Sequence, residues 1–191
     1  DWVFFPLVVR AFGLLASLVG IMMVKLKNED EEPMAALNRG YYVSAIIGAI
    51  GFYFISQEML GAWQFFVCGV IGIALSIAIV FITQYYTAGE YRPVREIAKA
   101  SETGPATNII TGFSIGLETT ALPIIAIAIS MLASYFLGQD AAATVLGVSD
   151  PSANSQFIFG LFGTAVATMG MLATAAFVLA MDTFGQITDN A

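Results

Sequence analysis

Long apolar segments separated by short polar connections dominate the chain. Five segments are apolar over residues 2–24, 41–60, 63–86, 106–137 and 156–181. At a rise of about 1.5 Å per residue, helices of this length can cross a hydrocarbon core of about 30 Å. Main-chain polar groups find no water inside lipid, so such segments favour helices, whose hydrogen bonds close within each segment. The pattern therefore predicts an all-α, multi-pass membrane protein with five transmembrane helices.

Composition supports this class and excludes several kinds of chemistry. The 191 residues are 58% hydrophobic and 11% charged, whereas soluble domains carry about 25% charged residues. A single cysteine, Cys68, and the lack of any histidine exclude an internal disulfide, a cysteine metal cage, histidine catalysis and histidine-ligated metals. The seven basic residues form no stripe, so we expect no nucleic-acid partner.

The basic residues indicate the orientation of the chain. Six of the seven lie in the connections after the first and third spans, namely Lys25, Lys27, Arg39, Arg92, Arg95 and Lys99. The positive-inside rule makes those connections cytoplasmic, which also places the extension after the fifth span, residues 182–191, on the cytoplasmic side. Arg10 is the exception, because it lies within the first span. We expect it to snorkel or to pair with an acid on another helix, without a catalytic role.

The connections carry mostly structural signals. We expect the acidic run at residues 28–33 to be a solvated loop tip rather than a cation site. The connection at 84–110 should form a cytoplasmic elbow, with a short surface helix over residues 94–100 and a turn at 103–105. The Ala-, Gly- and Ser-rich connection at 138–156 is expected to be an outer loop without a site.

The fourth span carries three features. Gly112 and Gly116 have the GxxxG spacing that lets helices approach closely, although such spacing is a weak signal for dimerisation. Glu118 has two open interpretations: an acid within a membrane is a functional candidate, and a hydrogen-bonded packing role is equally compatible with the neighbouring threonines. Pro123 is expected to kink the helix.

The fifth span is rich in small residues and ends on two acids. Its glycines, alanines and threonines should allow tight packing on several sides, as in a central helix. Asp182 and Asp189 are seven residues apart, so on a continuing helix they share one face, about 10 Å from each other. Asp189 could also be an ordinary helix-end acid in water, and Asp182 could pair with an Arg or Lys. Two acids alone do not specify a magnesium site, which usually shares its oxygen ligands with substrate phosphates.

Three stretches carry a resemblance to a known family. QYYTAGEYRPVREIAKASETGPATNII at 84–110, GLETTALPIIAIAIS at 116–130 and DTFGQITDNA at 182–191 resemble the membrane-integral pyrophosphatases that pump protons or sodium ions. The resemblance implies that the chain is an internal fragment, about helices seven to eleven of a roughly sixteen-helix bundle in two rings. The remaining helices of the same polypeptide complete that bundle, which forms a homodimer.

The resemblance also implies a mechanism. Magnesium-pyrophosphate would bind in a funnel at the cytoplasmic end of the inner ring, and its hydrolysis would drive H⁺ or Na⁺ across the bilayer. Asp189 would be a Mg²⁺ ligand, Asp182 would serve ion coupling, and Asn190 would support the site. K⁺ is a further activator in part of the family. The water-activating residues would lie outside this chain, so the fragment has no catalytic residue of its own and should be inactive alone.

Two other classes of protein remain open from the residues. In a secondary transporter or channel segment, Asp182 and Glu118 would handle ions without any hydrolysis. In a structural membrane subunit, the same acids would only pair with neighbouring helices.

Overall fold

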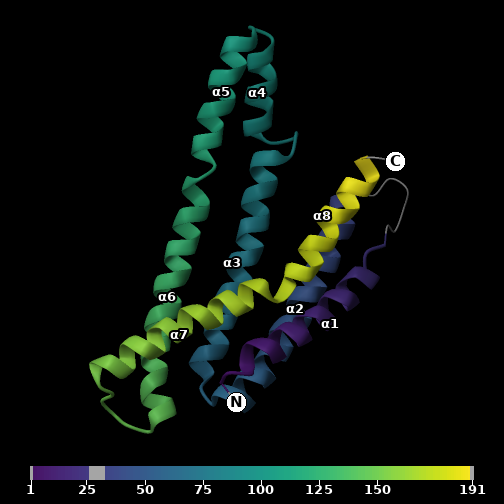
Figure 1. Cartoon of the computed structure of the whole chain (residues 1–191). Coiled ribbons are helices and arrows are strands. Elements are labelled where there is room, and N and C mark those ends of the chain that lie inside the picture. The colour runs from purple at the N-terminus through teal and green to yellow at the C-terminus, as the bar shows by residue number, and fades with distance from the viewer. Residues whose placement is uncertain (1, 26–32, 190–191) are drawn as a thin grey trace. The chain divides into compact units, whose positions relative to one another are not determined.

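The computed structural model describes residues 2–25 and 33–189, and this part of the chain folds into helices joined by short connections (Figure 1). Five helical stretches in it are long and apolar enough to cross a membrane, which confirms the all-α membrane class. The elements are α1 (Phe5–Met22), α2 (Pro33–Leu60), α3 (Trp63–Thr87), α4 (Arg92–Ser101), α5 (Pro105–Glu118), α6 (Ala121–Leu146), α7 (Ala153–Met171), the 3₁₀ helix η1 (Leu172–Thr174) and α8 (Ala175–Asp189).

The chain divides into two compact units. The first unit comprises Asp1–Ala74 and Met131–Ala191, and the second comprises Leu75–Ser130. The acidic run at 28–33 lies almost wholly outside the described residues, so its expected role as a solvated loop tip stays a prediction. The helix after it begins at Pro33, earlier than the expected apolar segment, because proline suits the first turn of a helix.

Close approach of main chains holds the first unit together. A β-carbon at Gly20 of α1 would lie 2.7 Å from the main-chain oxygen of Gly40 in α2. A β-carbon at Gly163 of α7 would overlap the main-chain oxygen of Ser134 in α6. Lipid tails are as apolar as the side chains, so helices in a membrane associate through such close packing rather than through the hydrophobic effect. The tight packing expected of the small residues in the fifth span is confirmed at Gly163, on α6, and at Gly170, on α3, and the central position of this span stays a prediction.

Aromatic rings fill the wider spaces in the first unit. Phe5, Phe52 and Phe65 are fully buried, and the Phe5 and Phe52 rings meet edge to face with centroids 5.7 Å apart. Trp2 contacts the ring of Phe162 at 4.8 Å. Offset and edge-to-face pairs of this kind add about 1 kcal/mol each beyond the area that they bury.

The outer loop expected over residues 138–156 begins only after Leu146. Residues 138–146 continue α6 to Leu146, so Asp140 and Thr144 lie on a helix. The run Asp-Ala-Ala-Ala explains the difference, because alanine has the highest helix propensity of all residues. The amide nitrogen of the buried Gln64 donates to the Asp140 carboxylate and to the Thr144 hydroxyl, at 2.9 Å each, and these bonds hold the start of α3 against this part of α6.

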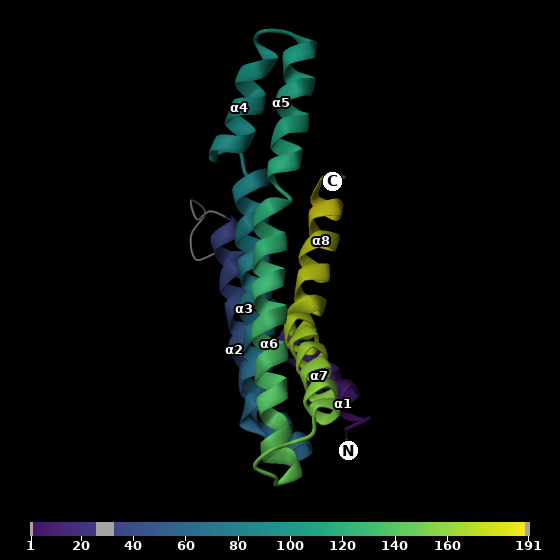
Figure 2. The same cartoon turned by 90° about the vertical axis from the view of Figure 1, so that its left-hand side faces the viewer.

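In the second unit, α4 and α5 form an antiparallel pair, visible in both views (Figures 1 and 2). Gly104 between them has φ of +129°, a conformation that favours glycine, and Pro105 occupies the first turn of α5. The Thr107 hydroxyl bonds the hydroxyl of Thr103 at 2.6 Å and donates to the main-chain oxygen of Gly104 at 2.8 Å. The expected surface helix and turn are both present.

Candidate functional site

The two acids of the fifth span lie on one helix. The main chain of α8 continues through both Asp182 and Asp189, so their spacing of seven residues sets them about 10 Å apart along the helix axis and on one face. The side chain of Asp182 is exposed within this chain. Asn190 lies outside the described residues, so its supporting role stays a prediction.

The first half of α8 contains its most deeply buried side chain, and large apolar side chains of its second half are exposed within this chain. Phe177 is 1% exposed, and its ring centroid lies 6.0 Å from that of Tyr41 in α2. Phe184 and Ile187, by contrast, are each 59% exposed. Both acids therefore follow the buried Phe177 along α8.

An apolar cavity lies beside α8. It has a volume of about 270 Å³ and is lined by Ile21, Val24, Leu37, Phe177, Ala180, Met181 and Phe184. None of these side chains carries a charge or a hydrogen-bonding group, so the cavity does not fit a phosphate or a metal ion. The acids stay the candidate residues, and neither of them is among the residues that line this cavity.

Metal binding at α8 needs further ligands. Within residues 2–25 and 33–189, no group of three or more His, Cys, Asp or Glu side chains is placed to hold a metal ion. Mg²⁺ requires near-octahedral oxygen coordination, supplied by one or two carboxylates together with waters and substrate phosphates. One carboxylate at the end of α8 could supply one such ligand, and the others would come from groups that the described residues do not contain.

Glu118 belongs to a hydrogen-bonded ion pair in the second unit. Its carboxylate accepts from Arg92 Nη2 at 2.7 Å and from the Tyr86 hydroxyl at 3.3 Å. Arg92 also lies 3.7 Å from Glu96 in the next turn of α4. The side chains of Arg92 and Glu118 are 53% and 46% exposed, so water screens the pair and it contributes little to stability. Of the two open interpretations of Glu118, this geometry favours the hydrogen-bonded packing role.

The fifth span is interrupted where the sequence predicted one continuous helix. The 3₁₀ helix η1 separates α7 from α8, and the chain changes direction there (Figure 1). Nothing in the local sequence marks this position, which has no proline. The interruption instead coincides with contacts to other helices. Gly170, just before it, packs on the main chain of Gly69 in α3, and Ala173, within it, packs on Gly13 of α1.

Arg10 is bound at the same interruption. Its guanidinium donates from Nη1 to the main-chain oxygen of Leu172. The sequence predicted snorkelling or an acidic partner, and the structure instead gives Arg10 a carbonyl oxygen as its partner within the described residues. The reason is geometric, because at the interruption the Leu172 carbonyl oxygen lies within reach of α1. A sequence pattern does not indicate which main-chain carbonyl will be placed in this way.

Comparison with known proteins assigns the family. The profile described as inorganic H⁺ pyrophosphatase matches residues 1–191. The chain is 52% identical over 192 residues to the K⁺-insensitive pyrophosphate-energized proton pump 2 of Moorella thermoacetica, covering 98% of this chain and 26% of that protein. It is 36% identical over 191 residues to the putative K⁺-stimulated pyrophosphate-energized sodium pump of Clostridium tetani, covering 100% of this chain and 26% of that protein.

A third relative is matched over most of its own length. The pyrophosphate-energized proton pump 2 of Mycoplana dimorpha is 35% identical over 201 residues, which cover 98% of this chain and 86% of that protein. By contrast, the chain spans only about a quarter of the length of the Moorella and Clostridium relatives. With the family profile matched from end to end and five helices able to span a membrane, the chain belongs to the inorganic H⁺ pyrophosphatase family of membrane pumps.

Proposed function

We propose that this chain is part of a membrane pyrophosphatase that couples hydrolysis of magnesium-pyrophosphate to the pumping of protons or sodium ions. The observation that carries the proposal is the family match along the whole chain. The names of the relatives, pyrophosphate-energized proton or sodium pumps, supply the substrate and the transported ions. The bilayer and the remaining helices of the complete pump, in a homodimer, are its partners.

In this proposal the two acids of α8 have different roles. Asp189, at the end of α8, is a ligand of Mg²⁺ on the cytoplasmic side, where metal ions clamp the pyrophosphate and neutralise the charge that develops during phosphoryl transfer. Asn190 supports that site. Asp182, two turns deeper, contributes to coupling between hydrolysis and ion movement. The shared helix supports this division, because it fixes the two acids on one face at two depths.

Ion selectivity and the need for K⁺ separate the relatives. The 52% identical relative is named as a K⁺-insensitive proton pump, and the 36% identical relative as a K⁺-stimulated sodium pump. Hydrolysis and uptake are therefore measured in vesicles with and without K⁺, and with Na⁺ either present or replaced. Acidification of the vesicle lumen without Na⁺ identifies the proton, and ²²Na⁺ accumulation identifies sodium.

The test uses the complete pump reconstituted in vesicles. Asp189→Asn should lower Mg²⁺-dependent phosphate release by about 100-fold or more, because a metal ligand at the reacting phosphate is lost. Asp182→Asn should reduce the ions moved per pyrophosphate more than it reduces hydrolysis. Asp150→Asn is the matched control, since Asp150 is exposed in the connection between α6 and α7, and it should leave both rates unchanged.

Three results would contradict the proposal. Gradient-driven ion flux without any requirement for pyrophosphate would identify a secondary transporter instead. Unchanged hydrolysis and pumping in Asp189→Asn would remove the metal role. Pyrophosphate hydrolysis by residues 1–191 alone would place the water-activating groups within this chain, against the expectation that the fragment is inactive.

A further inference from the structure

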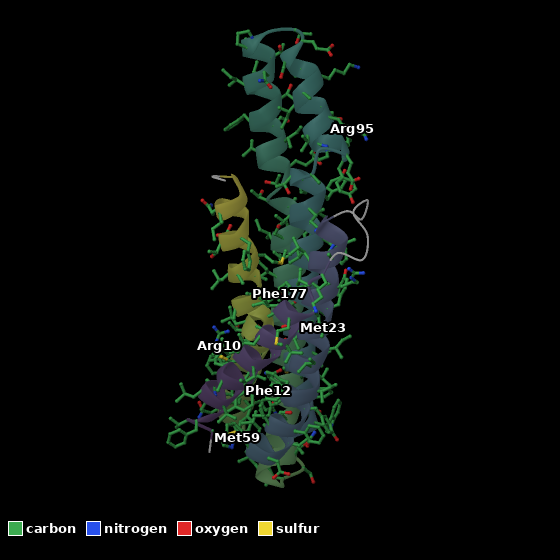
Figure 3. The ribbon with its side chains drawn as sticks, turned by 90° about the vertical axis from the view of Figure 1, so that its right-hand side faces the viewer. Arg10, Phe12, Met23, Met59, Arg95 and Phe177 are labelled. Carbon is green, nitrogen blue, oxygen red and sulfur yellow. The ribbon has the colours of Figure 1, made fainter. Side chains whose placement is uncertain are left out.

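The interruption of the fifth span has a polar contact with the first span. The Leu172 carbonyl oxygen accepts a hydrogen bond from the Ala175 main-chain N–H, which closes the 3₁₀ turn, and it accepts a second from the Arg10 guanidinium of α1. The two helices touch at this level, because a β-carbon at Gly13 would lie 2.8 Å from the main-chain oxygen of Ala173. Figure 3 shows Arg10 on the side of α1 near the start of α8.

The contact joins an arginine inside a span to an oxygen that can take a second bond. The Leu172 oxygen already accepts the bond that closes the 3₁₀ turn, and the Arg10 guanidinium uses its second lone pair. A charged side chain within a span needs polar partners there, and a guanidinium offers several donors in a rigid planar arrangement. The contact therefore favours the interrupted form of the span over a continuous helix, in which the Leu172 carbonyl would bond the N–H four residues later.

The interruption decides which way the acids face. Three residues of ideal 3₁₀ helix turn by about 360° and rise about 6 Å, whereas three residues of α-helix turn by about 300° and rise about 4.5 Å. The 3₁₀ turn thus rotates everything after it by about 60° and moves it about 1.5 Å along the axis, relative to an uninterrupted helix. Asp182 and Asp189 both follow η1 on the same rigid helix.

We propose that Arg10 is a positioning residue for the pump. By binding the Leu172 carbonyl it holds the 3₁₀ turn, and it thereby sets the direction in which Asp182 and Asp189 face. This inference rests on the proposed function of those two acids. The contacts of Gly170 with Gly69 and of Gly13 with Ala173 let the helices approach, but these glycines and alanine have no side-chain donor for the second lone pair of the Leu172 oxygen.

The surroundings of Arg10 make the contact testable by substitution. A cavity of about 340 Å³ lies beside it, lined by Arg10, Ala11, Gly13, Leu14, Leu172, Ala173 and Ala176. Shorter or unbranched side chains at position 10 therefore fit without overlap. Arg10→Lys keeps a cationic donor, whereas Arg10→Met has a similar apolar stem and no donor.

The experiment measures geometry and activity in the complete pump. Spin labels at Leu18 of α1 and Ile187 of α8, both exposed within this chain, report the rotation of α8. A rotation of about 60° moves a side chain about 5 Å, given a helix radius of about 5 Å. Arg10→Met should shift or broaden the label distance by about that amount. It should also raise the Mg²⁺ concentration for half-maximal hydrolysis and lower the maximal rate by about 10- to 100-fold, since small misplacements of reacting groups have effects of this size.

Two further variants complete the comparison. Arg10→Lys should keep the parent distance and Mg²⁺ dependence, and Arg95→Met on α4 should change neither, as a matched loss of an exposed arginine. Should Arg10→Met fail to accumulate in membranes, Arg10→Gln replaces it, because its shorter amide does not extend to the same oxygen. An unchanged label distance in the donor-free variant overturns the inference, whatever its activity. A parent pump without pyrophosphate hydrolysis overturns the proposed function instead, and the distance still tests the contact.

Discussion

Two of the five predicted spans are interrupted near their middle, and the two interruptions have different causes. The fourth span breaks between α5 and α6 at Thr119 and Thr120, and the fifth breaks at η1 between α7 and α8. The first break is encoded by residues next to it in the sequence. The second is imposed by helices that are distant in the sequence. The comparison shows that a helix break can be predicted from the local sequence in one span and not in another.

Pro123 explains the break in the fourth span. Proline has no N–H to donate, and its ring crowds the carbonyl of the residue four positions earlier, which is Thr119. The hydroxyls of Thr119 and Thr120 donate to main-chain oxygens of the preceding turn, at 2.7 Å and 2.8 Å, which is the local competition that disfavours regular helix. The helix expected to kink at Pro123 is therefore broken at Thr119 and Thr120, just before the proline.

Packing explains the break in the fifth span. A β-carbon at Gly72 of α3 would overlap the main-chain oxygen of Ala167 and lie 2.7 Å from the nitrogen of Met171, so α3 presses directly on the last turn of α7. Arg10 then donates to the Leu172 carbonyl oxygen, which also accepts the bond that closes the 3₁₀ turn. Neither contact is visible in residues 167–175 alone.

The largest expected effect comes from adding one methyl group beside the second break. Gly72→Ala should destabilise the complete pump by about 3 kcal/mol, because main-chain atoms cannot move aside as a side chain can. Gly112→Ala in α5 is the matched control, since a β-carbon there meets no atom within 4 Å, and it should be neutral or gain about 0.5–1 kcal/mol from the helix preference of alanine. Thermal unfolding in detergent measures both, and equal losses would contradict the comparison.

A smaller effect is expected from removing the local cause of the first break. Pro123→Ala restores an N–H that can donate to the Thr119 carbonyl. One added helical hydrogen bond, worth about 1 kcal/mol net, should slow amide hydrogen exchange around residues 119–124 by about fivefold. Exchange around residues 170–176 should not change and serves as the internal reference. Unaltered exchange at 119–124 would show that this break also depends on packing.

The smallest effect concerns the ion pair beside the first break. A double-mutant cycle with Arg92→Gln and Glu118→Gln should give only a small coupling energy, because both side chains are about half exposed and water screens their charges. The coupling should fall as salt rises from low to physiological concentration. A coupling of several kcal/mol that resists salt would mean that the complete pump buries this pair.

Much of the fold could be predicted because it follows from local chemistry. The apolar segments, the turn at Gly104 and Pro105, the surface helix α4 and the break near Pro123 each depend on residues that are neighbours in sequence. The continuation of α6 through Asp140 was wrongly expected to be loop, since small residues such as alanine suit both a loop and a helix end.

The candidate site was predictable only in part. The spacing of Asp182 and Asp189 follows from helix geometry once the helix continues, and the family pattern supplies their proposed roles. The partner of Arg10 could not be predicted, because every residue has a main-chain carbonyl, and the residue types do not indicate which one faces a distant side chain.

The sequence by itself determined the membrane class, the helices and the residues that share a helical face, because hydrophobicity and periodicity act over a few turns of chain. Only the tertiary structure decided where the fifth span is interrupted and what Arg10 binds. Those features arise where the main chains of α1 and α3 approach α7 and η1, and contact between distant segments depends on their relative positions in space, which local propensity does not set.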